Sequence, residues 1–384
     1  MDFLFESILK HPLFKSYIEL YKSINLDTLR KIIEKNFLIK KIDTLSSKDY
    51  LFLASDASSR SLKLSNPLEI IFHLIIALSN NINYPQIEQV RMYPIRPGVD
   101  ISKNSKLLLI FEEIEKQIQY PIKNVLQEKL TFMELLFLYE LMKKSPLNTL
   151  ALSDGSYEVN LKKALLYLIR REKVYKLLKN ENLSQIEKYH KEMIFEDIKK
   201  EEIDNFQEDL EKFLRRTLFV PKKITSFFIL ENIKKDLPSE LKNILFDHNN
   251  PLMDDVSLLN ICLDNEEVLI LKLPYKYLES NLYMNVLKNK LEDLSLNKDI
   301  YRIYIKTHSK IFIFETLNPK LFLDEFEKTI KNLIPLLEED GEVQPIKIAD
   351  RMARDLSKRQ LRMISYQIKF DIFKGMVYRE NDLT

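Results

Sequence analysis

The order of hydrophobic and polar positions along the chain predicts helices at its start and a strand soon after. In the first forty-odd residues, apolar side chains such as Phe14 and Ile18 recur at three- and four-residue spacing, which is typical of an amphipathic helix. A helical lead-in is therefore expected over residues 1–45. A strand is expected at Tyr50 to Ala54, and the short apolar stretch Ser61 to Leu64 is expected to pair with it as a hairpin.

Two longer apolar stretches before residue 145 are predicted as buried helices. Leu68 to Leu78 is interrupted by Glu69 and His73, and its length is about half of the roughly 20 residues that a membrane-spanning helix needs. Leu126 to Met142 is apolar nearly all round, which indicates a helix enclosed by other elements. Between them, the prolines within residues 85–97 favour a loop or an edge strand, because proline lacks a backbone donor.

The second half of the chain alternates between helical and strand patterns. A strand at Thr149 to Leu152 is followed by a charged, helix-periodic segment, which predicts a helical insertion within the core over residues 159–217. β-Branched and aromatic residues predict three later strands, the last two forming a hairpin, at Val268–Leu273, Ile300–Ile305 and Lys310–Phe314. A helix at Phe322 to Leu337 and a final long helix from about Ile348 complete the pattern.

The glycine, cysteine and histidine content excludes several classes of protein. The chain has four glycines, no two of them within six residues of each other, so neither a Walker A loop nor a Rossmann phosphate-binding turn can form. One cysteine and five scattered histidines provide neither a disulfide framework nor a local zinc site. Any metal ion must therefore be held mainly by carboxylates.

Charge and the N-terminal residues indicate where the chain is expected to work. The formal net charge is +2, so attraction to a polyanion has to come from local clusters of Lys and Arg. Asp2 stands where a signal peptide would carry its basic region, and no apolar stretch has the length of a membrane span. With 45% hydrophobic and 30% charged residues, the expectation is one cytoplasmic domain over residues 1–384 without membrane contact.

Two segments share one local design, in which an apolar run leads to Ser, Asp, a small residue and Ser. The first is Leu51 to Ser58 and contains Asp56, and the second is Thr149 to Ser156 and contains Asp154. Each aspartate is expected at a strand end, where side chains project into a crevice and the strand holds them rigidly. Two carboxylates placed there offer oxygen ligands to a hard divalent cation. The alternative for each is a plain turn in which the Asp side chain bonds its own backbone.

A third acid for the same site is expected on the helix before the second strand. Glu134 lies inside the apolar stretch, where a carboxylate is costly unless it is paired or coordinated. Glu140 is the competing candidate on a different helix face. Its alternative role is that of an exposed acid near the helix end, balanced by Lys143 and Lys144.

The C-terminal helix supplies a fourth acid together with basic residues. Asp350 is expected where the helix opens, either as an acid favoured by the helix dipole or as a fourth ligand. Arg351 and Arg354 belong to a basic face of the same helix. Such a face is either a plain solvated helix surface or, beside a carboxylate cluster, a surface that holds a phosphate backbone. Arg60, two residues after the first motif, is assigned to substrate binding with them.

Taken in order, these features resemble the NurA family of DNA-repair nucleases. They are strand-Asp-small-Ser, a helix bearing Glu, strand-Ser-Asp-Gly-Ser, a late hairpin, and the stretch from Gly341 to Asp350 that opens a terminal helix. The resemblance spans most of the chain. It implies an α/β fold with a ribonuclease-H-like mixed sheet core, a helical insertion, and helical N- and C-terminal extensions.

The same resemblance implies a function and a set of partners. These are Mn²⁺-dependent (or Mg²⁺-dependent) endo- and exonuclease activity on DNA in end resection and double-strand break repair, a homodimer, and a HerA-type hexameric ATPase. Asp56 and Asp154 match the family's metal-binding aspartates. Glu134 is the best match to its helix glutamate, with Glu140 as the other candidate, and Asp350 is the remaining member of the implied catalytic set.

The chain departs from the family pattern at two places. Ala57 stands where a glycine is usual in the first motif, and Glu342 and Asp350 stand where the family often has Tyr and His. An aspartate can still ligate a metal ion, but the roles of the Tyr and His are lost. Two alternatives stay open, namely a non-catalytic DNA-binding or scaffold subunit and another ribonuclease-H-like nuclease acting on RNA.

Overall fold

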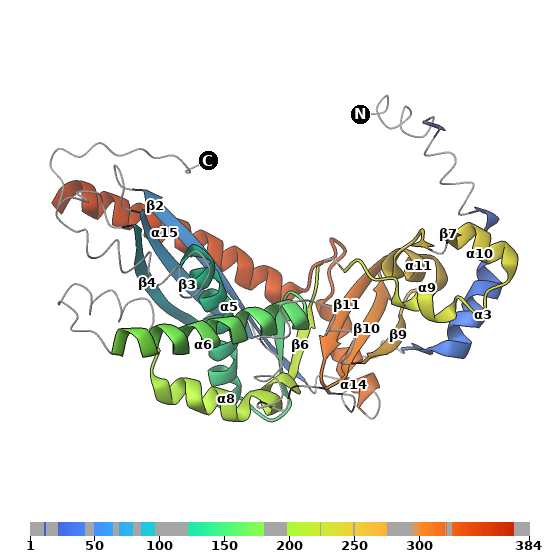
Figure 1. The fold of residues 1–384 in the computed structure, drawn as a ribbon, viewed down its shortest axis with the longest axis horizontal. Coiled ribbons are helices and arrows are strands. Elements are labelled where there is room, and N and C mark those ends of the chain that lie inside the picture. Colours follow the sequence, from blue (N-terminus) through green and yellow to red (C-terminus); the bar gives the residue numbers. More distant parts are fainter. Residues whose placement is uncertain are drawn as a thin grey trace.

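In this computed structural model, one mixed sheet of nine strands organises the part of the chain that the structure describes (Figure 1). The structure describes residues 11–12, 22–42, 50–63, 69–79, 86–96, 122–179, 198–222, 224–248, 250–274, 294, 296, 298–318, 320 and 325–371. The strands lie side by side in the order β1-β9-β10-β11-β6-β5-β2-β3-β4. Their bounds are Leu38–Lys41 (β1), Leu51–Lys63 (β2), Glu69–Ser79 (β3), Gln86–Arg96 (β4), Thr149–Asp154 (β5), Thr217–Val220 (β6), Glu267–Leu273 (β9), Ile300–Thr307 (β10) and Lys310–Thr316 (β11).

Five strands in one half of the sheet form the ribonuclease-H-like core that was expected. β2, β3 and β4 are antiparallel neighbours, β5 lies parallel to β2, and β6 lies parallel to β5. Helix α5 (Ile122–Lys143) precedes β5, and α6 (Tyr157–Lys179) and α8 (Lys200–Leu214) lie in the crossover that two parallel strands require. The α/β class with a mixed sheet is therefore confirmed.

Helices α5, α6 and α8 bury a common apolar core on one face of these strands. Leu53 and Phe219 of the sheet pack in the same cluster as Phe132, Leu165 and Phe206 of the three helices. The Phe132 and Phe206 rings meet edge to face with their centroids 5.5 Å apart. The described part of the segment expected as a helical insertion therefore packs against the sheet.

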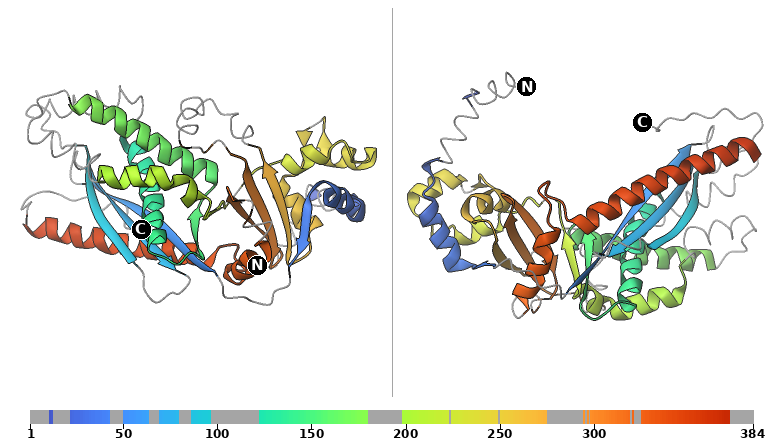
Figure 2. Two further views of the ribbon diagram at one scale, coloured as in Figure 1. Left: turned by 90° about the horizontal axis from the view of Figure 1, so that it is seen from below. Right: turned by 180° about the vertical axis from the view of Figure 1, so that it is seen from behind.

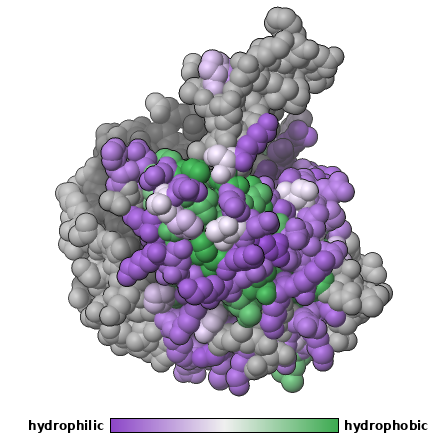
Figure 3. Space-filling view, turned by 90° about the vertical axis from the view of Figure 1, so that its right-hand side faces the viewer, coloured by the Kyte–Doolittle hydropathy of each residue, from purple (hydrophilic) through white to green (hydrophobic). Residues whose placement is uncertain are grey.

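The other half of the sheet is antiparallel. β11 pairs with β6, and β10, β9 and β1 follow in order. One face is covered by α3 (Leu26–Asn36), α9 (Phe228–Ile233) and α11 (Asp255–Cys262), and α14 (Phe326–Leu333) with the 3₁₀ turn Ile334–Leu336 covers the other (Figure 2). Two small elements complete this half, α10 (Ser239–Leu245) and the β7–β8 ladder (Phe246–Asp247 with Asn250–Pro251). Its outer end shows hydrophobic residues surrounded by hydrophilic ones (Figure 3).

The last helix, α15 (Gln344–Asp371), lies along β2 and β3 on the face opposite α5 (Figure 2). The hydroxyls of Ser58 on β2 and Ser357 on α15 are hydrogen-bonded at 2.9 Å. The helix begins at Gln344, four residues before the predicted start, so Asp350 lies in its second turn and not at its opening. None of the described helices is both long enough and apolar enough to span a membrane.

Two predictions about the early strands are wrong. Leu68 to Leu78 was expected as a helix, but Glu69–Ser79 forms strand β3, hydrogen-bonded on both sides by β2 and β4. Ser61 to Leu64 was expected to fold back on Tyr50 to Ala54, but β2 runs unbroken from Leu51 to Lys63. A continuous isoleucine-rich run has no period by which a strand can be told from a helix.

Other predicted elements are found with adjusted bounds. The proline-containing segment was expected as a loop or an edge strand, and it forms β4 at the edge of the sheet. The expected lead-in contains helix α3 and then strand β1, so it is not helical throughout. The later hairpin turns at His308 and Ser309, both with positive φ.

Candidate active site

Asp56 and Asp154 lie on neighbouring parallel strands of the core. Ser55 of β2 stands opposite Ser153 of β5, so the next residues along both strands, Asp56 and Asp154, are also side by side. Alternate residues of a strand face the same side of a sheet. Ala54 and Leu152 are buried on the face that the start of α15 covers, so both aspartates project toward that helix.

The two aspartates differ in their place along the strands. Asp154 ends β5 as predicted, because Gly155 takes a φ of +96°, which a side-chain-bearing residue rarely adopts, and turns the chain. Asp56 was also expected at a strand end, but it lies inside β2, which continues to Lys63. The prediction of a turn after Asp56 is wrong because β3 pairs with β2 from Leu53 to Lys63.

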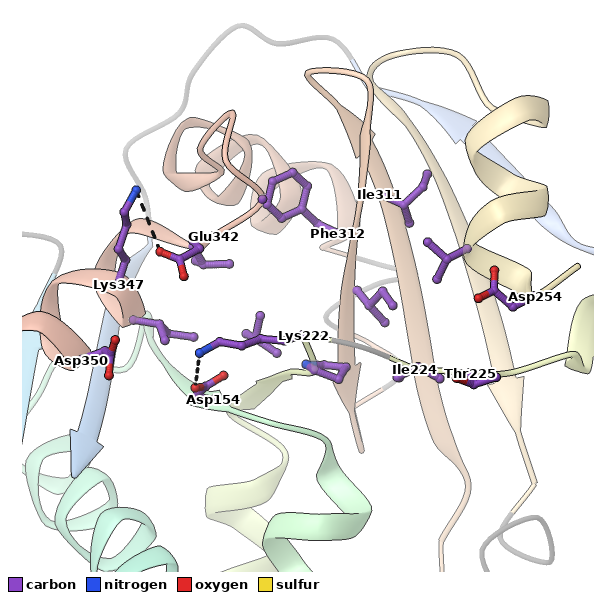
Figure 4. Close-up of a pocket in the computed structure, with 17 residues that line it drawn as sticks. Asp154, Lys222, Ile224, Thr225, Asp254, Ile311, Phe312, Glu342, Lys347 and Asp350 are labelled. Carbon is purple, nitrogen blue, oxygen red and sulfur yellow. Dashed lines mark ion pairs between the residues drawn. The ribbon is translucent and has the colours of Figure 1, made fainter. Parts of the chain in front are cut away.

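Asp154 is held by groups that surround the turn. The side-chain amide of Asn160 donates to the backbone carbonyl of Asp154 at 2.6 Å and to the Ser153 hydroxyl at 3.0 Å. The Lys222 ammonium, which follows β6, lies 2.8 Å from the Asp154 carboxylate (Figure 4). Although burial lowers the pKa of Lys222, its hydrogen bond to Asp154 and the charges of Asp154 and Asp350 raise that pKa above its ordinary value.

Asp350 reaches the same place from α15. Its carboxyl group is hydrogen-bonded to that of Asp56, and the Arg354 guanidinium lies 2.6 Å from its other side. Burial, the charge and hydrogen bond of Asp350, and the charge of Asp154 together raise the pKa of Asp56 to about 7. Like charges held this close disfavour the charged form of Asp56.

Glu134 completes the group from the opposite side of the sheet. It lies on α5, where the Ser55 hydroxyl donates to its backbone carbonyl at 3.4 Å. Strand β5 ends at Asp154, whereas β2 continues beyond Asp56. The backbone N–H of Ala57 donates a hydrogen bond to the Glu134 carboxylate, which by itself lowers the pKa of Glu134. Burial and the charges of Asp56 and Asp154 nevertheless raise the pKa of Glu134 well above its ordinary value.

Glu140 lies elsewhere on the same helix. Its carboxylate is 3.9 Å from the Lys143 ammonium, one turn along α5, which is the exposed pairing that sequence reasoning gave as its alternative role. The structure therefore brings together Asp56, Glu134, Asp154 and Asp350, which are called the acid cluster below.

The acid cluster suits a divalent cation by its chemistry. All four side chains offer hard oxygen donors, and partly buried like charges need a counter-charge. Among the residues that the structure describes, no three His, Cys, Asp or Glu side chains already stand as a finished ligand set. Asp350 is tied to Asp56 and Arg354, and Asp154 to Lys222, so these contacts would have to open for all four acids to bind one ion.

The predicted basic residues fall into three situations. Arg351 is exposed on α15. Arg354 is exposed but paired with Asp350. The backbone of Arg60 lies in β2, and its side chain is outside the described residues.

Sequence reasoning missed Lys222 and Asn160. Lys222 follows β6, a strand of four residues that was not predicted, and no periodic pattern marks it. Asn160, buried in the first turn of α6, had a weak signal in its position six residues after Asp154.

Comparisons with known proteins give similarity in structure alone. No protein-family model and no curated protein sequence matches the chain. The chain is similar to the crystal structure of the NurA nuclease from Sulfolobus solfataricus, with a TM-score of 0.49 and 10% identity over 98% of this chain and 99% of the other. The chain is also similar to a crystal structure of NurA with manganese, with a TM-score of 0.43 and 13% sequence identity. This match covers 92% of this chain and 98% of the other. At these identities the similarity concerns the path of the backbone and not the side chains of the site.

Proposed function

We propose that the chain is a divalent-metal-dependent DNA nuclease whose active site is the acid cluster. One observation carries this proposal. Four acids that are spread over almost 300 residues of sequence meet at one place, from β2, α5, β5 and α15. Burial raises the pKa of Asp56 and of Glu134, and the charges of the neighbouring acids raise both further. A group of acids that costs stability in this way indicates a functional site.

Asp56, Glu134 and Asp154 would hold Mn²⁺ or Mg²⁺, and Asp350 would complete the site. When bound, such an ion activates water and stabilises the leaving oxygen of a phosphodiester. The protein's own task is to orient the acids, which the strands and the Asn160 hydrogen bonds do for Asp56 and Asp154. Lys222 is the nearby cation that can contact a phosphate oxygen.

The exposed side of α15 is the proposed path for the DNA backbone. Arg351, Lys358 and Arg362 are all exposed and follow one another at helical spacing along the face turned away from the sheet. Phosphate contacts of this kind position a strand without reading its sequence. A role in end resection and double-strand break repair, a homodimer and a HerA-type hexameric ATPase partner, which the sequence resemblance implies, are part of the proposal.

The test is incubation of the purified full chain with end-labelled single- and double-stranded DNA in Mn²⁺, Mg²⁺ or chelator. Cleavage is expected with metal only, and Asp56→Asn and Asp154→Asn are expected to abolish it. Asp204→Asn, which removes an exposed acid of α8 on the face of the sheet opposite α15, is the matched control and keeps wild-type activity.

Two outcomes would contradict the proposal. Cleavage in chelator, or undiminished cleavage by the two acid variants, would remove the acid cluster from the reaction. Failure to cut any DNA, even with a HerA-type ATPase present, would favour a scaffold subunit, and cleavage of RNA alone would change the substrate.

A further inference from the structure

A cavity of about 250 Å³ opens directly beside Asp154 and Asp350 (Figure 4). Its walls come from the loop after β6, strand β11, the first residues of α11 and the segment that leads into α15. We infer that this cavity binds the base of one unpaired nucleotide next to the phosphate that is cleaved. The inference rests on the proposed nuclease function and names the form of its substrate.

The lining changes character along the cavity. The end nearest the acid cluster is charged, with Asp154, Lys222 and Asp350 around it (Figure 4). Glu342 and Lys347 also lie on this charged side (Figure 4). Ile224, Ile311 and Phe312 lie in the middle, between the charged side and Asp254 (Figure 4). Val256, Val343 and Ile346 are further apolar residues of the lining. Thr225 and Asp254 lie on the side away from Asp154 (Figure 4).

A nucleotide has charged, apolar and polar parts in the same order as the cavity. Its phosphate would lie at the charged end, within reach of Lys222, whose side chain is 57% exposed beside Asp154. Its base has two apolar faces that suit the aliphatic middle, and polar edges that suit the far side. The Asp254 carboxylate accepts a hydrogen bond from the Ser257 N–H at 2.7 Å, which fixes its position. A fixed carboxylate can accept from the amino group of a base.

The size of the cavity limits what it can take. At about 250 Å³ it lies below the roughly 300 to 1,000 Å³ of pockets that hold drug-sized ligands. This volume is enough for one base. A base in a duplex would first have to leave its stack, which costs least at a frayed end or in a single strand. The cavity therefore predicts preference for DNA with unpaired nucleotides at the site of cleavage.

The experiment measures base insertion without cleavage. Short single strands carrying the fluorescent base 2-aminopurine at one position are titrated with the full chain in Ca²⁺, an oxygen-binding cation. A rise in fluorescence is expected when the base leaves its neighbours and enters the aliphatic cavity. Ile311→Trp and Val256→Trp fill the cavity from two different walls and should each abolish the rise. They should also weaken Kd roughly 5- to 150-fold, equivalent to about 1 to 3 kcal/mol per base.

The matched control is Ile39→Trp on β1, another half-buried aliphatic residue in the same hydrophobic cluster as Ile311 and Val256. It should bind DNA as the wild type does, and thermal melting must show that all three variants fold. Equal fluorescence rise in the filled variants and the control, or no rise in the wild type, would overturn the inference. A rise without any cleavage in Mn²⁺ would support the cavity and remove the proposed chemistry, so the two failures are distinguishable.

Discussion

Replacement of Asp56 by Asn should make the metal-free protein more stable. Asp56 is held between Asp350 and Asp154, and burial with these neighbours raises its pKa from 3.8 to about 7. Above that pH the folded chain must carry a charge that its surroundings oppose. Asn has almost the same shape, keeps a hydrogen bond to Asp350 and carries no charge, so the variant removes this cost.

The size and sign of the effect follow from the two pKa values. Because the folded pKa lies above the unfolded one, the unfolded chain binds fewer protons between pH 3.8 and about 7, and stability falls as the pH rises through that range. At 1.36 kcal/mol per pH unit, the full difference corresponds to about 4 kcal/mol. The gain of Asp56→Asn over the wild type should be about 4 kcal/mol at pH 8 and less than about 2 kcal/mol at pH 5.

Thermal and urea unfolding at the two pH values, both in chelator, measure this difference. Asp355→Asn on the exposed side of α15 is the control and should show no comparable gain. Added Mn²⁺ should stabilise the wild type more than Asp56→Asn, because a ligand stabilises only the form that binds it. A variant that unfolds like the wild type at pH 8, or whose gain is the same at both pH values, would refute the idea that Asp56 is a destabilising buried acid.

Three further substitutions test the surroundings of the site. Lys222→Gln should raise Mn²⁺ affinity by up to about fivefold in calorimetry, since an exposed ion pair with Asp154 contributes about 0.2 to 1 kcal/mol; weaker binding would contradict competition between the lysine and the metal. Glu315→Leu should cost about 3 to 5 kcal/mol in urea unfolding, because the Arg302 guanidinium, 2.9 Å away and buried with it, would lose its counter-charge; a neutral effect would show that Arg302 finds another partner. Asn160→Ala should cost about 1 to 3 kcal/mol and lower kcat more than it raises KM, because the Asp154 turn loses its hydrogen bonds; a change in KM alone would assign Asn160 to substrate binding.

The strand that carries Asp154 could be predicted because its signals are local. Thr149 to Leu152 is a short apolar run, and Gly155 can take the positive φ that ends it. The proximity of Asp56 and Asp154 could be predicted from their shared motif. It needs only that the two aspartates point to the same side of neighbouring strands. Asp350 was also named from the sequence, and it lies near Asp56, although α15 begins earlier than its sequence indicates.

The errors arise where tertiary pairing outweighs local preference. Asp56 and Ala57 are weak strand formers, yet residues 56–60 remain in β2 because β3 pairs with all of them. β3 itself, with Ile70, Ile71, Ile75 and Ile76, is equally compatible with a buried helix until its two partner strands are known. The pairing of Lys222 with Asp154 depends on β6 lying beside β5, which no sequence pattern indicated.

Manganese binding to the full chain, measured by titration calorimetry, is the most direct test of the acid cluster. The wild type and Asp355→Asn are expected to bind Mn²⁺ with the same affinity. Asp154→Asn and Glu134→Gln are expected to lose more than about tenfold, since even groups that only support metal ligands contribute about 10- to 100-fold. A wild type that binds no Mn²⁺, or four proteins that bind it equally, would contradict the assignment of Asp56, Glu134, Asp154 and Asp350 as a metal centre.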